Sequence, residues 1–143
     1  MTPRIALIHA VAVAMPPVAA AFAALWPEAR VTNLLEDSLS PDRAAEGALT
    51  PAMCARIAAM ARYAAATGAD AVLFTCSAFG PAIEGAARDL APLPVLRPNE
   101  AMFAAALETG RRIGMLATFG PSVTSMEEEF AEAAGGSGAT LAT

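Results

Sequence analysis

The chain alternates short, continuous apolar runs with longer stretches of helical periodicity, and this alternation constrains its fold more than any other feature. Runs of unbroken apolar character are typical of parallel strands that helices cover on both faces. Strand–helix alternation with right-handed crossovers therefore predicts an α/β fold built on one doubly wound parallel sheet. Six runs are candidate strands of that sheet: Ile5–His9, Arg30–Leu35, Ala71–Thr75, Leu93–Leu96, Ile113–Ala117 and Thr140–Ala142. We expect the first run, the most apolar, to be central in the order 2-1-3-4.

Local signals mark the helices between these runs. Thr50 followed by Pro51 predicts a capped helix start, and Gly68 predicts its end. Apolar residues inside this helix recur at three- and four-residue spacing and form a core-facing stripe: Met53, Ile57, Met60 and Ala64. Capping and helix-ending residues likewise bound two later helices, at Asn99 and Gly110 and at Pro121 and Gly135.

Charge and composition exclude several classes of function. The 143 residues suffice for one domain, and 14 acidic against 9 basic residues leave a net charge of −5, so we expect no nucleic-acid partner. All nine basic residues are Arg, which excludes a lysine Schiff base and a P-loop lysine. His9 is the single histidine, which excludes a multi-histidine metal site. We therefore expect no metal.

The apolar segment at residues 5–26 has two interpretations. It follows Arg4 and carries almost no charge, as a signal peptide would. However, Pro16 and Pro17 interrupt its centre and His9 its first half, which disfavours a membrane-spanning helix. We interpret it as a buried strand, a loop and a helix. Two cysteines are too few for a disulfide framework, so we expect a cytoplasmic protein without a membrane partner.

Ligands of open α/β sheets bind beyond the carboxyl ends of the strands, and one segment there carries chemistry. Cys76 ends the third run and precedes a helix start at Gly80 and Pro81. A thiol there meets free backbone N–H groups and the positive end of a helix, which favours the thiolate. We therefore predict that Cys76 is alkylated faster than Cys54, which lies inside a helix. The alternative is that Cys76 is a small buried apolar residue.

Four segments, in this order, resemble the aspartate/glutamate/hydantoin racemase superfamily, which includes maleate isomerases and arylmalonate decarboxylases: NLLEDSL, GADAVLFTCSAFGPAIEGAA, LPVLRPNEAMFAAAL and RRIGMLATFGPSVTSMEEEF. The resemblance extends over residues 4–134. It implies flavodoxin-like α/β lobes with the active site between them and no cofactor. It also implies one cysteine from each lobe, on opposite faces of the substrate's α-carbon.

The resemblance also implies roles for individual residues. Cys76 would be the base of the first lobe. Backbone N–H groups of Ser77 and Ala78 would hold the carboxylate of the substrate, and Thr75 would add a hydroxyl. At the opening of the second lobe, Thr118 and Ser122 would contact the substrate. Ser122 and its neighbours Thr124 and Ser125 are equally well explained as helix caps.

The chain also departs from the family pattern. It has Cys76-Ser77-Ala78 where amino-acid racemases usually have Cys-Asn-Thr, and its first loop reads HAVAVAMPP instead of a glycine-rich sequence. The apolar loop argues against glutamate and favours a substrate with a less polar substituent. We expect residues 1–110 to form the first lobe and residues 111–143 the start of a second, apparently truncated lobe. Its cysteine would then lie beyond Thr143.

These observations predict a cofactor-independent racemase or isomerase in which Cys76 acts on the α-carbon of a small carboxylate. One alternative is a noncatalytic, flavodoxin-like module that binds a carboxylate or oligomerises. A weaker alternative is a cysteine hydrolase or a decarboxylase, and for a hydrolase His9, at the end of the first strand, would assist Cys76. We count His9 among the substrate-site residues on the same grounds, and we expect a homo-oligomer.

Overall fold

The computed structural model describes residues 2–143, and its first four strands form one parallel sheet. The strand order is β2-β1-β3-β4, so the predicted order with the first strand in the centre is confirmed. The strands are β1 (Arg4–His9), β2 (Arg30–Leu35), β3 (Ala71–Phe74) and β4 (Val95–Leu96). All residues of β1 except Arg4 are buried, which matches its unbroken apolar character.

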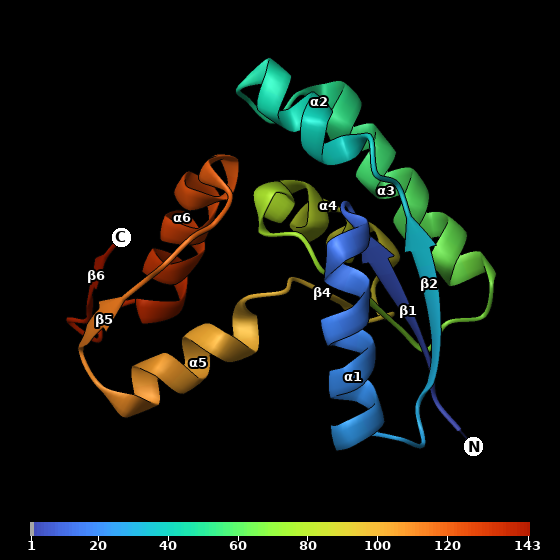
Figure 1. The fold of residues 1–143 in the computed structure, drawn as a ribbon, viewed down its shortest axis with the longest axis horizontal. Coiled ribbons are helices and arrows are strands. Elements are labelled where there is room, and N and C mark those ends of the chain that lie inside the picture. Colours follow the sequence, from blue (N-terminus) through green and yellow to red (C-terminus); the bar gives the residue numbers. More distant parts are fainter. Residues whose placement is uncertain (1) are drawn as a thin grey trace.

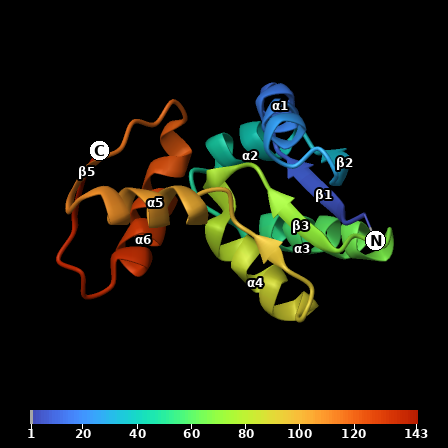
Figure 2. The ribbon, with the colours of Figure 1, turned by 90° about the horizontal axis from the view of Figure 1, so that it is seen from below.

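Helices cover both faces of this sheet. Helix α1 (Met15–Leu25) lies on one face, and α3 (Pro51–Ala66) and α4 (Gly80–Leu90) pack side by side on the other (Figures 1 and 2). Helix α2 (Leu39–Glu46) follows β2 at the end towards which the strands point (Figure 1). The predicted α/β class with a doubly wound parallel sheet is therefore correct, as expected of a flavodoxin-like racemase lobe.

The signals around residues 50–68 act as the sequence predicts. The Met53 N–H donates to Thr50 Oγ1 over 3.3 Å, Pro51 opens α3, and Gly68 adopts φ +79° just after the helix. The four residues of the apolar stripe are all buried in the main core beneath the sheet: Met53, Ile57, Met60 and Ala64.

The prediction of one sheet for all six strands is wrong. β5 (Arg112–Gly114) and β6 (Thr140–Ala142) form a separate parallel pair. This pair packs with α5 (Glu100–Thr109) and α6 (Val123–Ala134) around a second core, in which the rings of Phe103 and Phe130 meet edge to face at 5.7 Å. Because β4 has only two residues, it offers little edge for a further strand, and the two phenylalanines give the later strands a core of their own.

We call β1–β4 with α1–α4 the four-stranded unit, and α5, β5, α6 and β6 the two-stranded unit. The predicted division of the chain at residues 110 and 111 stays a prediction, although α5, which precedes it, packs against α6. Three short 3-10 turns lead into helices: η1 (Ala12–Ala14), η2 (Ser77–Phe79) and η3 (Gly120–Ser122). Helix α6 thus begins after η3 and not at Pro121. Within residues 2–143, no helix has the length and apolar character needed to cross a membrane.

Candidate active site

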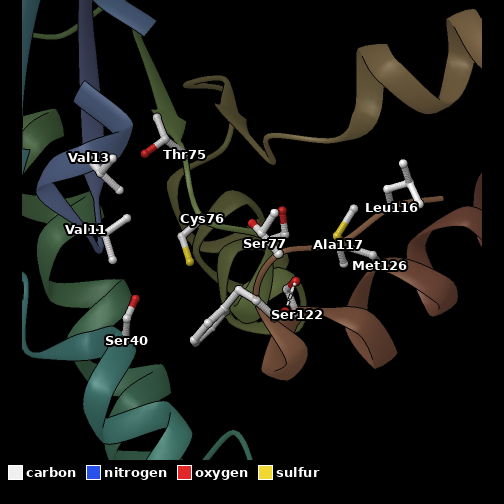
Figure 3. A pocket seen from close by; sticks show the side chains of 12 residues that line it. Val11, Val13, Ser40, Thr75, Cys76, Ser77, Leu116, Ala117, Ser122 and Met126 are labelled. Atoms are coloured by element: carbon white, nitrogen blue, oxygen red, sulfur yellow. Dashed lines mark hydrogen bonds between the residues drawn. The ribbon is translucent and has the colours of Figure 1, made fainter. Parts of the chain in front are cut away.

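A pocket of about 420 Å³ lies at the carboxyl ends of the first strands, between the two units. Val11 and Val13, from the segment after β1, form one wall, and Leu116 and Met126 of the two-stranded unit face them (Figure 3). Twelve of the described residues line the pocket, none of them Asp, Glu, His or Arg: Val11, Val13, Ser40, Thr75, Cys76, Ser77, Leu116, Ala117, Thr118, Phe119, Ser122 and Met126.

Cys76 lies at the centre of this pocket because β3 ends just before it and η2 begins just after it. Its side chain is partly exposed, and the sulfur points into the space between Ser40 and Ser122 (Figure 3). Burial raises the pKa of the Cys76 thiol, although the Ala78 N–H and the Ser40 hydroxyl oppose that rise. The expectation that the helix start leaves the thiolate favoured is therefore wrong, because desolvation outweighs the nearby donors.

The structure brings most of the predicted site residues together. Thr75, Ser77, Thr118 and Ser122 line the same pocket as Cys76. The Ser122 hydroxyl donates to the Phe119 carbonyl over 2.7 Å, so its remaining lone pairs are what it can offer to a ligand.

Ala78 and His9, two other predicted site residues, lie outside the pocket lining. Ala78 is buried, and its N–H approaches the Cys76 sulfur. His9 is completely buried, with Nδ1 2.8 Å from Thr75 Oγ1 and Nε2 2.9 Å from Asn33 Oδ1. Both ring nitrogens are thus engaged, and His9 meets the pocket through Thr75 and not directly.

Sequence reasoning missed Ser40, which lies in the first turn of α2 and lines the pocket opposite Cys76 (Figure 3). Its hydroxyl oxygen is buried and has no nitrogen or oxygen partner in the described part of the chain. The only signal was indirect, since residues 36–38 follow the second strand at the ligand-binding edge of the sheet. Nothing in the sequence shows that the helix after this segment turns Ser40 towards a thiol.

Asn99 corrects another prediction. It precedes α5, as expected of a cap, but its side chain makes no capping hydrogen bond. Instead, Asn99 Oδ1 accepts from the Ser77 hydroxyl at 3.1 Å, and Nδ2 donates to Glu129 Oε2 at 3.1 Å. Three side chains that are far apart in the sequence thus form one chain of hydrogen bonds that reaches the pocket.

The electrostatics of the pocket come from the backbone. Helices α2, α4 and α6 all begin near it, the last two through η2 and η3. Helix starts present free N–H groups and positive partial charge, which can hold a carboxylate without a basic side chain. No cluster of three or more possible metal-ligating His, Cys, Asp or Glu side chains occurs within residues 2–143.

One comparison with known proteins identifies a family for the chain. The sequence model of the family described as Asp/Glu/Hydantoin racemase matches residues 9–142, nearly the whole chain. None of the curated proteins compared with the chain matches it. The family match covers β3, Cys76 after it, the three helix starts near the pocket and the two-stranded unit, and it confirms the resemblance carried by the four segments. The chain belongs to the Asp/Glu/hydantoin racemase family.

Proposed function

We propose that the protein is a cofactor-independent racemase or isomerase in which Cys76 exchanges a proton at the α-carbon of a small carboxylate. Family membership supports the general kind of function. The observation that carries the finer proposal is the position of Cys76. It is the one thiol among the described residues that line the pocket, these residues include no Asp, Glu, His or Arg, and helices α2, α4 and α6 begin near them. Removal of a proton from the carbon next to a carboxylate needs a base such as this thiol, and it needs hydrogen-bond donors that stabilise the negative charge on the carboxylate.

Different parts of the pocket bind different parts of the substrate. In η3, Pro121 has no N–H and the Ser122 N–H donates to the Phe119 carbonyl, so the carboxylate is held by backbone N–H groups at η2, where Ser77 lines the pocket. These groups stabilise the negative charge that develops on the carboxylate when the α-proton leaves. Preorganised donors of this kind contribute a factor of about 10²–10³ each to the stabilisation of an oxyanion. Val11, Val13 and Leu116 then contact the substituent, and we infer that this substituent is apolar.

Cys76 carries out the proton transfer. As a thiolate it takes the α-proton, and the electron pair of the C–H bond moves into the carboxylate group. A raised pKa reduces the thiolate fraction at neutral pH but makes the thiolate a stronger base. Return of a solvent-derived proton from the same sulfur gives exchange with retention. Inversion requires an acid on the opposite face of the carbon, and Cys76 is the one thiol among the described lining residues.

Proton exchange in deuterated water tests the proposal. Amino acids, hydantoins and substituted malonates are incubated with the protein, and incorporated deuterium is followed by mass spectrometry. We expect slow exchange with retention for an apolar member of the panel and negligible inversion. Cys76→Ala should abolish the exchange, and Cys76→Ser should be nearly as damaging because a serine hydroxyl is far less acidic.

Cys54→Ala is the matched control, because Cys54 lies in α3 against the main core and does not line the pocket. It should leave the exchange rate unchanged. Binding of these carboxylates without any Cys76-dependent exchange would instead identify a noncatalytic binding module. A trapped acyl-cysteine would identify a hydrolase.

A further inference from the structure

Glu129 is a buried acid that the proposed mechanism does not use. It lies on α6 and is only 4% exposed. Its Oε2 accepts from Asn99 Nδ2 at 3.1 Å, and its Oε1 has no hydrogen-bond partner within residues 2–143. Burial of a carboxyl group with one hydrogen-bond partner costs desolvation free energy, which indicates that its contact with Asn99 has a role.

The backbone of α4 makes room for this carboxyl group. A Cβ atom at Gly80 would lie 2.3 Å from Glu129 Oε1 and 2.8 Å from Ser125 Oγ. Only glycine therefore lets Glu129 lie against the start of α4 and reach Asn99. The position of the Glu129 side chain thus depends on the close approach of α6 to α4 at Gly80.

Glu129 fixes the orientation of the Asn99 amide. An ionised carboxylate can only accept hydrogen bonds, whereas a protonated one can also donate through its O–H, so it is the ionised form of Glu129 that constrains the amide. The amide nitrogen of Asn99 therefore faces Glu129, and its oxygen faces Ser77. The reverse orientation would place two oxygens with no proton between them at 3.1 Å when Glu129 is ionised.

The orientation of Asn99 in turn fixes the polarity of Ser77. A serine hydroxyl has one proton, and that of Ser77 is donated to Asn99 Oδ1 at 3.1 Å. Ser77 also lines the pocket beside Cys76. What remains for a ligand is the lone pairs of Ser77 Oγ, which accept hydrogen bonds.

We propose that Glu129 is a positioning residue that acts through Asn99 to hold Ser77 as a hydrogen-bond acceptor, so that the pocket selects carboxylates with an N–H or O–H donor next to the reacting carbon. This inference rests on the proposed function in that it takes the pocket as the substrate site. It extends that function because it gives the substrate a third feature, a hydrogen-bond donor, besides the carboxylate and the apolar substituent.

Two carboxylate probes that differ only in the group on the α-oxygen test it. 2-Hydroxy-3-methylbutanoate can donate to Ser77, whereas 2-methoxy-3-methylbutanoate can only accept. Dissociation constants of both are measured by ligand-observed NMR. We expect the hydroxy acid to bind about five-fold more tightly, the gain of one neutral hydrogen bond.

Glu129→Gln should reduce this preference to less than about two-fold. A glutamine amide can donate as well as accept, so the Asn99 amide is free to rotate and exchange the positions of its oxygen and nitrogen. Glu128→Gln is the matched control: it removes the same charge from an exposed position on the same helix and should keep the preference. A merely structural role of Glu129 would weaken both probes together and leave their ratio unchanged.

Asn99→Ala cuts the chain of hydrogen bonds at a second point and should have the same effect, so the test does not depend on the folding of one variant. Equal binding of the two probes to the native protein, or an unchanged ratio in Glu129→Gln and Asn99→Ala, would overturn the inference. Because binding needs no proton transfer, these results are separate from the Cys76-dependent exchange. Selective binding without exchange would reject the proposed function alone.

Discussion

The four-stranded and two-stranded units differ in how they are stabilised. In the former, the central strand β1 is buried from Ile5 to His9 between helices on both faces. In the latter, β5 is exposed at both ends, and the core consists of four buried side chains, among them the aromatic pair of α5 and α6. The larger unit therefore has a core sufficient for its own fold, whereas the smaller depends more on its contacts with η2 and α4.

This difference matters because the pocket uses both units. Cys76 and Ser77 come from the well-packed unit, whereas Thr118, Ser122 and Met126 come from the other. Cys76 is thus held at the edge of the four-stranded sheet, and the opposite wall is held by the junction between α6 and α4. Variants in the first core should therefore affect the whole fold, and variants at the junction should affect the site first.

The largest expected effect is in the first core. Ile8→Ala removes a side chain that is 1% exposed and should lower the free energy of unfolding by about 2–5 kcal/mol. Leu35→Ala, at a 38% exposed position on the neighbouring strand β2, should cost far less. Urea unfolding followed by circular dichroism measures both values. Similar losses for the two variants would contradict the assignment of the dominant core to β1.

A smaller effect is expected at the junction. Gly80→Ala places a Cβ against Glu129 Oε1 and Ser125 Oγ and should cost about 1–3 kcal/mol. Gly85→Ala is the matched control on the same helix, because its Cβ would meet only Arg88 Nη2, at 3.9 Å, and alanine favours a helix by about 0.5–1 kcal/mol. Gly80→Ala should also remove the preference for the hydroxy acid. Equal stability of the two variants would show that the close approach is unimportant.

The next effect concerns pH. Burial raises the pKa of Glu129 above its ordinary value of 4.5, and the nearby negative charges of Glu100 and Glu132 add to that rise. The hydrogen bond from Asn99 and the charge of Arg97 lower the pKa by less than this rise. Because the folded state holds this proton more tightly than the unfolded state, the associated stability is complete below about pH 4.5. It is lost as the pH rises through the raised pKa.

Thermal unfolding of the native protein and of Glu129→Gln across this pH range measures that loss. The variant cannot ionise at this position, so its stability relative to the native protein should increase as the pH rises. A difference between the two proteins that is independent of pH would contradict the raised pKa.

The smallest effect is expected at Ser40. Its hydroxyl lowers the pKa of Cys76, so Ser40→Ala should raise that pKa further. The rate of iodoacetamide alkylation of Cys76 at pH 7 should fall by about two- to ten-fold, and the pH profile should move to higher pH. Cys54 serves as an internal control in the same sample. An unchanged Cys76 rate would show that Ser40 does not interact with the thiol.

Much of the fold follows from local pattern, whereas much of the site does not. The unbroken apolar run before His9 indicates a central strand, and the stripe from Met53 to Ala64 indicates the buried face of α3, because both depend on neighbours in the sequence. The separate pairing of β5 and β6 was missed because it depends on the packing of Phe103 against Phe130.

The position of Cys76 was predictable from the end of a strand, but its environment was not. Ser40 and the chain from Ser77 through Asn99 to Glu129 arise from contacts between helices distant in sequence. The upward shift of the Cys76 pKa has the same origin, because burial depends on the residues that surround the thiol and not on those adjacent to it in the chain.

None of the described residues that line the pocket is Asp, Glu, His or Arg, and this has a kinetic consequence. Backbone dipoles keep their charge distribution at every pH at which the protein is folded, so the backbone N–H groups that we propose as carboxylate-binding elements do not titrate. Cys76 is the one ionisable side chain among the described lining residues. A reaction with that thiolate as its base should therefore show a single rising limb in the pH dependence of kcat/KM, and not the bell shape produced by an acid and a base that both titrate.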